Sequence, residues 1–409
     1  MRMITEANLA AVLGRVTGVP RVVASGNFAT PAALLGVLDK VVAEYRLFML
    51  NAHADVPTRP EVTLETPFVG PSMRGRPNLR YFPARLSLVP HLLSGPLPPD
   101  IALLHTSTPH NGTVSLGTEV NVLPAAIEAV RSRGGLVLAQ VNTQMPYTYG
   151  DGVLTVEEID YGIDVDVPLL IPPQRKADEV AGLIGEQVAQ LVPDGATLQL
   201  GIGAVPDAVL SALTPRSSLR VWSEMFSDGV LALERAGALE QDVPVRASFV
   251  FGSKELYEWV DRNPRVRMLR TEKTNSPGLI AKHPLLMSIN SALQVDLYGQ
   301  ANANRVRGAI YSGFGGQTDF VVGALHSAGG KAVIALPSWH TKTQSSTVVP
   351  LLAGPVTSFQ HSYIVSEHGA AAIWGRDADA QARQLIDEVA HPRVRDGLRA
   401  AAHDIGLRP

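Results

Sequence analysis

The chain has 409 residues, more than one ordinary hydrophobic core supports, and this length predicts two domains. Its 45% hydrophobic and 18% charged residues are typical of a globular enzyme rather than a disordered or fibrous chain. A net charge of −3 argues against nucleic acid or an anionic membrane as the main partner, and the absence of cysteine excludes disulfides, thiolate nucleophiles and Cys-ligated metals.

The first segment, MRMITEANLAAVLGRV, predicts an amphipathic helix rather than a signal peptide, because Glu6 and Asn8 interrupt its apolar pattern. The chain contains no run of about 18 apolar residues, so no membrane span is expected. We therefore expect a cytoplasmic protein.

Further along the chain, short apolar runs alternate with helical patterns. The runs are RVVAS, DIALLHTS, GLVLAQV, TLQLG, LRVWS, RASFVFG, RGAIYSG and AVIALPS, and the helical patterns include PAALLGVLDKVVAEY and ADEVAGLIGEQVAQLV. This alternation predicts an α/β fold of two open domains with mostly parallel sheets. The breaker cluster IPPQRK, residues 171–176, places the boundary between an N-terminal domain, 1–174, and a C-terminal domain, 175–409.

The two halves share a short pattern. Gly26, Pro31 and Ala33 have the same spacing as Gly201, Pro206 and Ala208, and an aliphatic helix face follows in both places. The match indicates an internal duplication, and chance convergence of two strand–turn–helix units is the alternative.

The stretch TLQLGIGAVPDAVL, residues 197–210, predicts a strand, a glycine turn and a helix. Gly201 and Gly203 allow close approach of a ligand to the backbone, and the amides at the start of the helix favour an anion. A dinucleotide site would need a third glycine where Pro206 stands. A turn that only packs a helix on a sheet is the structural alternative.

Glu224, in the segment SLRVWSEMFSDGV, follows the next predicted strand. A carboxylate at the carboxyl end of a parallel strand lies where open α/β sheets place their chemistry, so Glu224 is a candidate nucleophile. An ordinary Glu is ionised at pH 7 and needs no partner base. The alternative is an acid that stabilises the amino end of the following helix.

A second glycine cluster, YSGFGGQTDF, spans residues 311–320. Gly313, Gly315 and Gly316 would expose backbone N–H groups suited to an oxyanion or a thioester carbonyl. A tightly turned loop without such a role is the alternative.

Several long motifs carry a family resemblance: GIGAVPDAV, SEMFSDGVLALERAGAL, FGSKELYEWVDRNP, NSALQVDLYGQANANRVRGAIYSGFGGQTDF and SEHGAAAIWG, with HNGTVSLGTEVNVLPAAIEAV and AQVNTQMPYTYGDGVLTVEEID in the N-terminal half. In this order they resemble the acetyl-CoA hydrolase/transferase family, which includes 4-hydroxybutyrate, butyryl and acetate CoA-transferases. The resemblance covers nearly the whole chain. It implies two related α/β domains with the active site between them and CoA bound mainly by the C-terminal one.

The resemblance also implies residue roles. Glu224 falls on the family's catalytic glutamate, which becomes a glutamyl-CoA thioester, and Gly315 with Gly316 falls on the loop that steadies the thioester carbonyl. The residues that the resemblance assigns to CoA are Gly201, Ile202, Gly203, Ala204 and Val205, together with Gly313 and Lys342. The glycine turn at residues 201–203 is therefore expected to face coenzyme A.

Two segments depart from the family pattern. SWHTKTQSSTVVP, residues 338–350, lacks an arginine that is usual there, and residues 357–369 carry Gln360, His361 and His368 where an arginine and an aromatic are common. The acyl or CoA contacts of these segments are left unassigned.

The other polar motifs point to no separate chemistry. None of the eleven histidines forms an HxH or HxxxH pair, so no metal site is expected, and His105, His110, His340 and His361 are interpreted as loop or core residues. For His110, a contact with the substrate is the alternative, because its loop resembles a motif of the family that faces the cleft. The segment SMRGRPNLRYFPAR, residues 72–85, could suggest RNA, but the overall acidity favours a solvated loop.

The implied reaction is a ping-pong transfer of CoA between a short-chain acyl-CoA and a carboxylate, with no metal and no tightly bound cofactor. An acyl-CoA hydrolase of the same fold and a non-catalytic CoA- or nucleotide-binding module are the alternatives. A homodimer or a larger closed assembly is expected. The sequence names neither the donor and acceptor acids nor the balance of transfer and hydrolysis.

Overall fold

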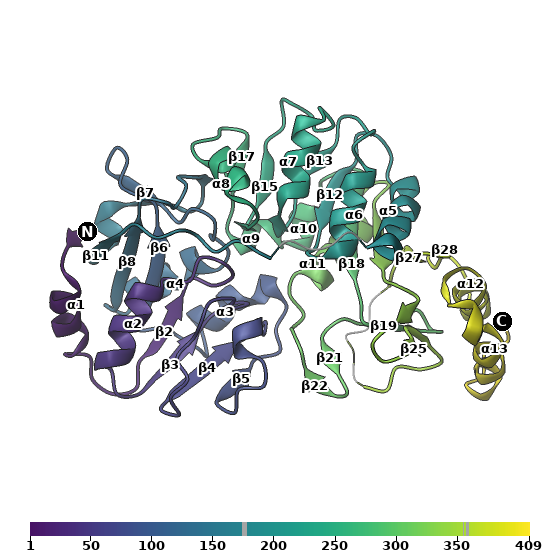
Figure 1. Cartoon of the computed structure of the whole chain (residues 1–409), viewed down its shortest axis with the longest axis horizontal. Coiled ribbons are helices and arrows are strands. Elements are labelled where there is room, and N and C mark those ends of the chain that lie inside the picture. The colour runs from purple at the N-terminus through teal and green to yellow at the C-terminus, as the bar shows by residue number, and fades with distance from the viewer. Residues whose placement is uncertain (174–177, 355, 357–359) are drawn as a thin grey trace. The chain divides into compact units, whose positions relative to one another are not determined.

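The computed structural model describes residues 1–173, 178–354, 356 and 360–409, and within them the chain forms two compact units (Figure 1). Unit 1 contains Met1–Pro172, Pro244–Thr274 and Ser312–Gly315, and unit 2 contains Pro173–Val243, Asn275–Tyr311 and Gly316–Pro409. The predicted domain boundary between residues 174 and 175 lies outside the described residues and stays a prediction. The compact units differ from that simple division because 244–274 and 312–315 pack with unit 1.

Unit 1 is built on an eight-stranded sheet in which every neighbouring pair is parallel, in the order β1-β11-β8-β6-β2-β3-β4-β5. Its strands are β1 (Arg2–Met3), β2 (Arg21–Ala24), β3 (Tyr45–Phe48), β4 (Val62–Thr66), β5 (Leu79–Tyr81), β6 (Ile101–Thr106), β8 (Leu136–Asn142) and β11 (Tyr161–Val165). Every residue of β2 and β6 is buried, as expected for a parallel sheet covered on both faces.

The helices of unit 1 are α1 (Glu6–Leu13), α2 (Ala32–Val41), α3 (Val89–Ser94), α4 (Leu123–Ser132), α8 (Lys254–Val260) and α9 (Thr271–Thr274), with short helices η1 (Pro71–Met73), η2 (Leu86–Leu88) and η3 (Val156–Glu158). Two small sheets join β7 (Thr113–Ser115) with β10 (Val153–Thr155), and β15 (Val245–Ala247) with β17 (Val266–Met268) and β9 (Tyr149–Gly150). The first helix agrees with the amphipathic helix expected at the start of the chain, and Thr5 caps it by accepting from Asn8 N.

Unit 2 is built on a six-stranded sheet in the order β13-β12-β18-β23-β27-β28, parallel except for the last pair. Its strands are β12 (Thr197–Leu200), β13 (Arg220–Val221), β18 (Leu286–Ser291), β23 (Lys331–Ala335), β27 (Tyr363–Ser366) and β28 (Gly369–Ala372). The α/β class with mostly parallel sheets is thereby confirmed.

The helices of unit 2 are α5 (Glu179–Leu191), α6 (Ala204–Ala212), α7 (Asp228–Arg235), α10 (Pro277–Ile280), α11 (Gln317–His326), α12 (Ala378–Gln384) and α13 (Arg395–Asp404), with η4 (Leu385–Val389) and η5 (Pro392–Val394). The smaller strands of unit 2 are β14 (Met225–Phe226), β19 (Gln294–Asp296), β20 (Ala301–Asn302), β21 (Arg305–Val306), β22 (Ala309–Ile310), β24 (Trp339–His340), β25 (Ser345–Ser346) and β26 (Val348–Val349). One further short strand, β16 (Phe249–Val250), belongs to unit 1. Helix α5 begins where expected because Asp178 accepts from Val180 N and Ala181 N.

Two of the predicted strands do not join the main sheets. RASFVFG forms the short strands β15 and β16, and RGAIYSG contributes only Ala309–Ile310, which pairs with β21 in an antiparallel hairpin. The helix predicted from Pro31 ends at Val41, and β3 begins at Tyr45. In each case an apolar run of a few residues does not by itself distinguish a sheet strand from a hairpin or a helix end.

No helix in the described parts of the chain is long and apolar enough to cross a membrane.

Candidate active site

The carboxyl edge of the unit 2 sheet has a topological switch point. From β12 the chain places β13 on one side and later β18 on the other, so the connections leave the carboxyl ends of β12 and β18 in opposite directions. Open α/β sheets bind ligands in the crevice at such a point. The glycine turn at residues 201–203 directly follows β12 and therefore lies at this edge.

The turn leads into α6 with an unusual backbone. Gly203 has a φ of 135° and a ψ of 177°, a conformation that only glycine adopts readily, and it precedes the first helical residue, Ala204. Ile202 is 40% exposed, whereas Val205 is buried. The first N–H groups of an α-helix have no partners within the helix, so this end of α6 suits an anionic group.

The predicted counterpart in unit 1 is a closed turn. A Cβ at Gly26 would lie 2.1 Å from the carbonyl oxygen of Leu50, and Asn27 and Phe28 are buried. A Cβ at Gly201 would meet only Pro206 Cγ, at 3.9 Å. The two glycines thus serve different purposes, close backbone packing in unit 1 and an open turn in unit 2.

A buried network of polar side chains holds β12, the strand that leads into the open turn. Gln199 Oε1 accepts from Ser288 Oγ at 2.8 Å and from Asn290 Nδ2 at 3.0 Å, which ties β12 to β18. On the other side, Ser223 Oγ lies 3.3 Å from Leu200 N and 3.2 Å from Leu200 O. These bonds fix the end of β12 relative to the residue that precedes Glu224.

Glu224 itself lies between β13 and β14 and receives two hydrogen bonds. Asn275 Nδ2 donates to its Oε2 at 3.0 Å, and the backbone N–H of Gly316 also donates to the carboxylate. Helix α7 starts only at Asp228, which is the acid of its first turn. The alternative of a helix-stabilising role for Glu224 therefore loses its basis.

Burial changes the chemistry of Glu224. Its side chain keeps partial solvent access, yet burial among protein atoms is the largest influence and raises its pKa from 4.5 to about 7. The hydrogen bond from Asn275 lowers the pKa, the nearby charge of buried Asp319 raises it, and the Gly316 N–H lowers it. The expectation that Glu224 is fully ionised at pH 7 is therefore wrong, because desolvation disfavours the charged form.

Gly316 must be a glycine for lack of space. A Cβ there would lie 1.9 Å from Glu224 Oε2 and 2.2 Å from Asn275 Nδ2, so any side chain would displace the carboxylate or its donor. Its φ of −94° is accessible to any residue, which leaves close approach as the reason. Gly316 precedes α11 as its N-cap residue, and Asp319 lies in the first turn of that helix.

The other two glycines of the cluster pack within unit 1. Gly313 forms an antiparallel bridge with Phe68, and a Cβ on it would lie 2.3 Å from Pro67 O. Gly315 has a φ of 54°, and a Cβ on it would lie 3.1 Å from Phe68 Cε2. Their predicted contacts with CoA or a thioester stay predictions.

Lys342 lies on the exposed turn between β24 and β25 and forms no hydrogen bond or ion pair with another described residue. In the same atypical segment, Ser338 N donates to Glu367 at 2.9 Å, and the Ser338 hydroxyl also donates to that carboxylate. Residues 357–359 of the second atypical segment lie outside the described residues.

Two of the singled-out histidines are core residues. His105 is buried, its Nδ1 lies 3.2 Å from Ala29 O, and burial lowers its pKa to about 4. His361 is likewise buried, and its Nδ1 lies 3.0 Å from Gly299 O. Among the described residues, no group of three or more His, Asp or Glu side chains is arranged to hold a metal ion.

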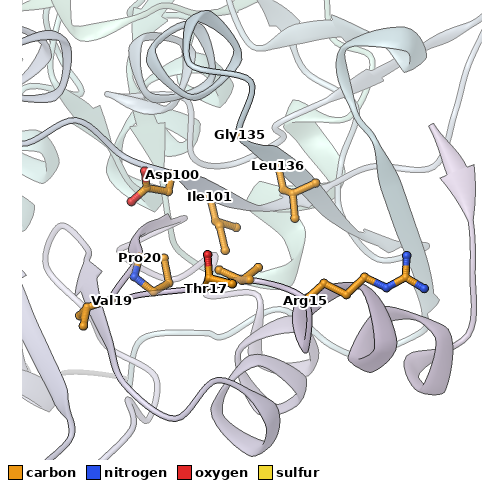
Figure 2. Close-up of a pocket in the computed structure, with 9 residues that line it drawn as sticks. Arg15, Thr17, Val19, Pro20, Asp100, Ile101, Gly135 and Leu136 are labelled. Atoms are coloured by element: carbon orange, nitrogen blue, oxygen red, sulfur yellow. The ribbon is translucent and has the colours of Figure 1, made fainter.

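In unit 1, a hollow of about 360 Å³ lies at the end of the sheet where the parallel strands begin (Figure 2). Its lining surrounds the amino ends of β2, β6 and β8 and consists of Arg15, Val16, Thr17, Val19, Pro20, Asp100, Ile101, Gly135 and Leu136. Because parallel sheets place their chemistry at the carboxyl ends of the strands, we do not assign this hollow to the active site.

The sequence interpretation missed Asn275 and Asp319. Asn275 follows α9 and precedes the proline that begins α10, a place where asparagine usually serves a turn, so nothing marked it as a partner of Glu224. Asp319 lies three residues after Gly316, at a helix start where an acid is ordinary. Only the fold brings both to the carboxylate.

An α/β architecture with a desolvated carboxylate and an open glycine turn makes this edge of the sheet a candidate enzyme site. The model of the acetyl-CoA hydrolase/transferase C-terminal domain matches residues 252–402. The 4-hydroxybutyrate coenzyme A transferase of Clostridium kluyveri is 41% identical over 313 residues, which cover 74% of this chain and 72% of that protein.

Two further comparisons extend over more of the chain. The succinyl-CoA:acetate/propanoyl-CoA:succinate CoA transferase of Fasciola hepatica is 37% identical over 407 residues, covering 93% of this chain and 84% of that protein. The crystal structure of RipA from Yersinia pestis superposes with a TM-score of 0.92 at 29% identity, covering 99% of this chain and 97% of that one.

The chain belongs to the acetyl-CoA hydrolase/transferase family. It is accordingly an enzyme of the CoA-transferase and acetyl-CoA hydrolase type.

Proposed function

We propose that this enzyme transfers CoA between a short-chain acyl-CoA and a carboxylate acceptor through a glutamyl-CoA thioester on Glu224. The observation that carries the proposal is the pair of hydrogen bonds from Asn275 and Gly316 to a single desolvated carboxylate. The name of the C. kluyveri relative supports 4-hydroxybutyrate as a substrate, that of the F. hepatica relative supports acetate, and the family resemblance adds butyrate.

The first half-reaction uses the carboxylate as nucleophile. In its ionised form Glu224 attacks the acyl-CoA carbonyl and expels CoA thiolate, which leaves an anhydride between the acyl group and the glutamyl side chain. The thiolate then attacks the glutamyl carbonyl and releases the donor carboxylate. The product is glutamyl-CoA, and the energy of the thioester is retained without ATP.

The second half-reaction reverses these steps with a different acid. The acceptor carboxylate attacks glutamyl-CoA and expels CoA thiolate, which then attacks the acceptor's acyl carbonyl and frees Glu224. Donor acid leaves before acceptor acid enters, so the kinetics are ping-pong.

The hydrogen bonds assign different roles to the two carboxylate oxygens. Oε2, which accepts from Asn275, remains as the carbonyl oxygen of the anhydride and the thioester, and Oε1 forms the new bond. Each attack on the glutamyl carbonyl puts negative charge on Oε2. The Asn275 amide, already aimed at that oxygen, stabilises the charge without reorganisation, an effect typically worth about 10²–10³ in rate for one such donor.

The raised pKa of Glu224 assists the nucleophile. A carboxylate whose conjugate acid has a pKa of about 7 is more basic than an ordinary one, and at neutral pH about half of the molecules are ionised. Burial therefore strengthens the nucleophile at a modest loss in its ionised fraction.

The turn at Gly201, Ile202, Gly203, Ala204 and Val205 supports a CoA-binding role by its place at the switch point and its open backbone. The predicted CoA contacts of Gly313 and Lys342 are kept as part of the proposal. No tightly bound cofactor is needed. The homo-oligomer and the cytoplasmic location stay predictions, and size-exclusion chromatography with light scattering measures the first of them.

Mass spectrometry tests the covalent step. After incubation with acetyl-CoA and no acceptor, the peptide containing Glu224 should gain the mass of CoA, and hydroxylamine should remove it. Glu224→Gln should form no adduct, whereas Glu186→Gln, an exposed change on α5 of the same unit, should form it as the wild type does. An adduct on a different carboxylate would contradict the assignment of Glu224.

Acceptor dependence separates the alternatives. A transferase makes new acyl-CoA only when a second carboxylate is present. Release of free CoA at the same rate without an acceptor would identify a hydrolase, and CoA binding without turnover would identify a binding module.

A further inference from the structure

Two kinds of hydrogen bond join the end of β12 to the segment that carries Glu224, and all of the residues involved belong to unit 2. The backbone N–H of Trp222 donates to Leu198 O at 3.1 Å, as in the ladder of a parallel sheet. Further along β12 the partner is a side chain instead. Leu200 N donates to Ser223 Oγ at 3.3 Å, and Ser223 Oγ donates to Leu200 O at 3.2 Å. The Ser223 hydroxyl, which can accept and donate at once, therefore continues the connection beyond the end of β13.

This pair of residues lies between the glycine turn and the proposed nucleophile. Leu200 directly precedes the turn at residues 201–203, and Ser223 directly precedes Glu224. A single planar peptide separates each member of the pair from its functional neighbour, and the Cα atoms across such a peptide lie about 3.8 Å apart. A change in the distance between Ser223 and Leu200 therefore changes the distance between Glu224 and the turn.

Different side chains hold the two sides of the end of β12. On one side, Gln199 Oε1 accepts from Ser288 Oγ and Asn290 Nδ2, both of β18. On the other side, the Ser223 hydroxyl bonds to Leu200. All five residues are buried, and a buried backbone group that loses its partner destabilises the fold. The Gln199 network thus fixes β12 within the sheet, whereas the Ser223 hydroxyl fixes it to the segment after β13.

We propose that Ser223, through its hydroxyl group, is a positioning residue that sets the distance between the CoA-binding turn and the Glu224 carboxylate. It takes no part in the chemistry itself. The hydrogen bonds from Asn275 and Gly316 orient the carboxylate, and Ser223 places the backbone from which that side chain extends. The inference rests on the proposed function only where its catalytic consequence is concerned.

A second buried serine of unit 2 provides a matched control. Ser327 Oγ accepts from Leu286 N at 3.2 Å and donates to His283 O at 2.6 Å, so it makes the same two kinds of bond with the backbone. Leu286 is the first residue of β18, so these bonds lie at the amino end of the sheet, away from the glycine turn. Ser223→Ala and Ser327→Ala therefore delete equivalent bonds at opposite edges of one sheet.

Steady-state kinetics and calorimetry give the catalytic test. Ser223→Ala should lower kcat by about tenfold or more relative to Ser327→Ala, since a displacement of about 1 Å can cost 100-fold. The Kd for CoA should stay within about threefold of the wild-type value, because the amides of the turn itself are unchanged. Equal kcat values in the two variants would overturn the proposal. So would a Kd for CoA that rises about tenfold while kcat is kept, because Ser223 would then serve binding alone.

Hydrogen exchange measured by mass spectrometry tests the connection without any activity. The peptide that contains Leu200 should exchange about tenfold faster in Ser223→Ala than in the wild type, because the Leu200 N–H loses its acceptor. In Ser327→Ala that peptide should exchange as in the wild type, and the peptide that contains Leu286 should exchange faster instead. Unchanged exchange at Leu200 in Ser223→Ala would contradict the positioning role.

The two tests separate the inference from the proposed function. If the wild type forms no glutamyl-CoA, the proposed function fails, yet the exchange at Leu200 still decides whether the Ser223 hydroxyl holds the end of β12 to the segment that carries Glu224.

Discussion

The buried carboxyl group of Glu224 should make the stability of the protein depend on pH. Glu224→Gln keeps the shape of the side chain and an oxygen that can accept from Asn275 and Gly316, but it removes the ionisable proton. Comparison of the variant with the wild type therefore measures how much ionisation of Glu224 lowers the free energy of unfolding.

The direction follows from the two pKa values. The folded state holds the proton up to about pH 7, whereas the unfolded chain releases it near 4.5, so the folded state binds more protons in between. Stability due to this group accordingly falls as pH rises from 4.5 to 7. Below that window Glu224 is neutral in both states, and the wild type and Glu224→Gln should be equally stable.

The size follows from the same shift. The pKa difference corresponds to about 3 kcal/mol at pH 8, on a scale of 1.36 kcal/mol per unit, and it is an upper value because the side chain keeps some contact with solvent. One kcal/mol moves the melting temperature of a domain of 150–250 residues by roughly 2–4 °C. Glu224→Gln should then melt up to about 6–12 °C above the wild type at pH 8.

Thermal unfolding measured from pH 4 to pH 8 checks this prediction. Glu186→Gln is the control, since it makes the same change on the exposed face of α5 and should shift the melting temperature little at any pH. A melting difference for Glu224→Gln that does not grow between pH 5 and pH 8 would refute the raised pKa.

Further predictions concern activity. Below pH 7, kcat/KM should fall about tenfold per pH unit because only ionised Glu224 attacks, and a profile flat from pH 5.5 to 7 would contradict this. Gly316→Ala should lower kcat by about 10²–10³, because the new methyl group collides with the carboxylate, and near-normal turnover of folded protein would exclude the loop's role. Asn275→Ala should lower kcat by a similar factor and raise the pH midpoint of kcat/KM, both measured in the same rate profile. Asp319→Asn should lower that midpoint, since it removes a nearby negative charge, and a midpoint that rises would contradict the assigned influence. Gly201→Val should weaken CoA binding in calorimetry with little loss of stability, because open space surrounds this position, and binding of NAD in place of CoA would overturn the ligand.

The glycine turn illustrates where the sequence sufficed. Two glycines and a proline after an apolar run specify a strand, a turn and a helix, because these residues have strong local preferences. The same holds for the cap at Asp178 and for the strand–helix alternation behind the α/β class. In Gly26 and Gly201 the same local pattern has different surroundings, however, and only the fold distinguished a closed turn from an open one.

For Glu224 too, the sequence predicted some properties and only the fold determined the others. Its place after a strand was visible in the sequence, and its motif carried the family resemblance. Its pKa was not visible, because desolvation and the charge of Asp319 depend on atoms that are distant along the chain. An ordinary ionised carboxylate was the natural expectation from sequence, and burial, assisted by the charge of Asp319, overturned it.

The chain's own sequence determined which segments form helices, turns and most strands, since these depend on neighbours within a few residues. The tertiary structure alone decided that 244–274 and 312–315 pack with unit 1, that Asn275 and Gly316 meet at Glu224, and that Leu86 holds the Gly315 carbonyl. The hydrogen bonds among these contacts join residues far apart in the chain, from 51 positions between Asn275 and Glu224 to 229 between Leu86 and Gly315. No local preference encodes them, because hydrogen-bond and packing partners at such separations exist only after the sheets have formed.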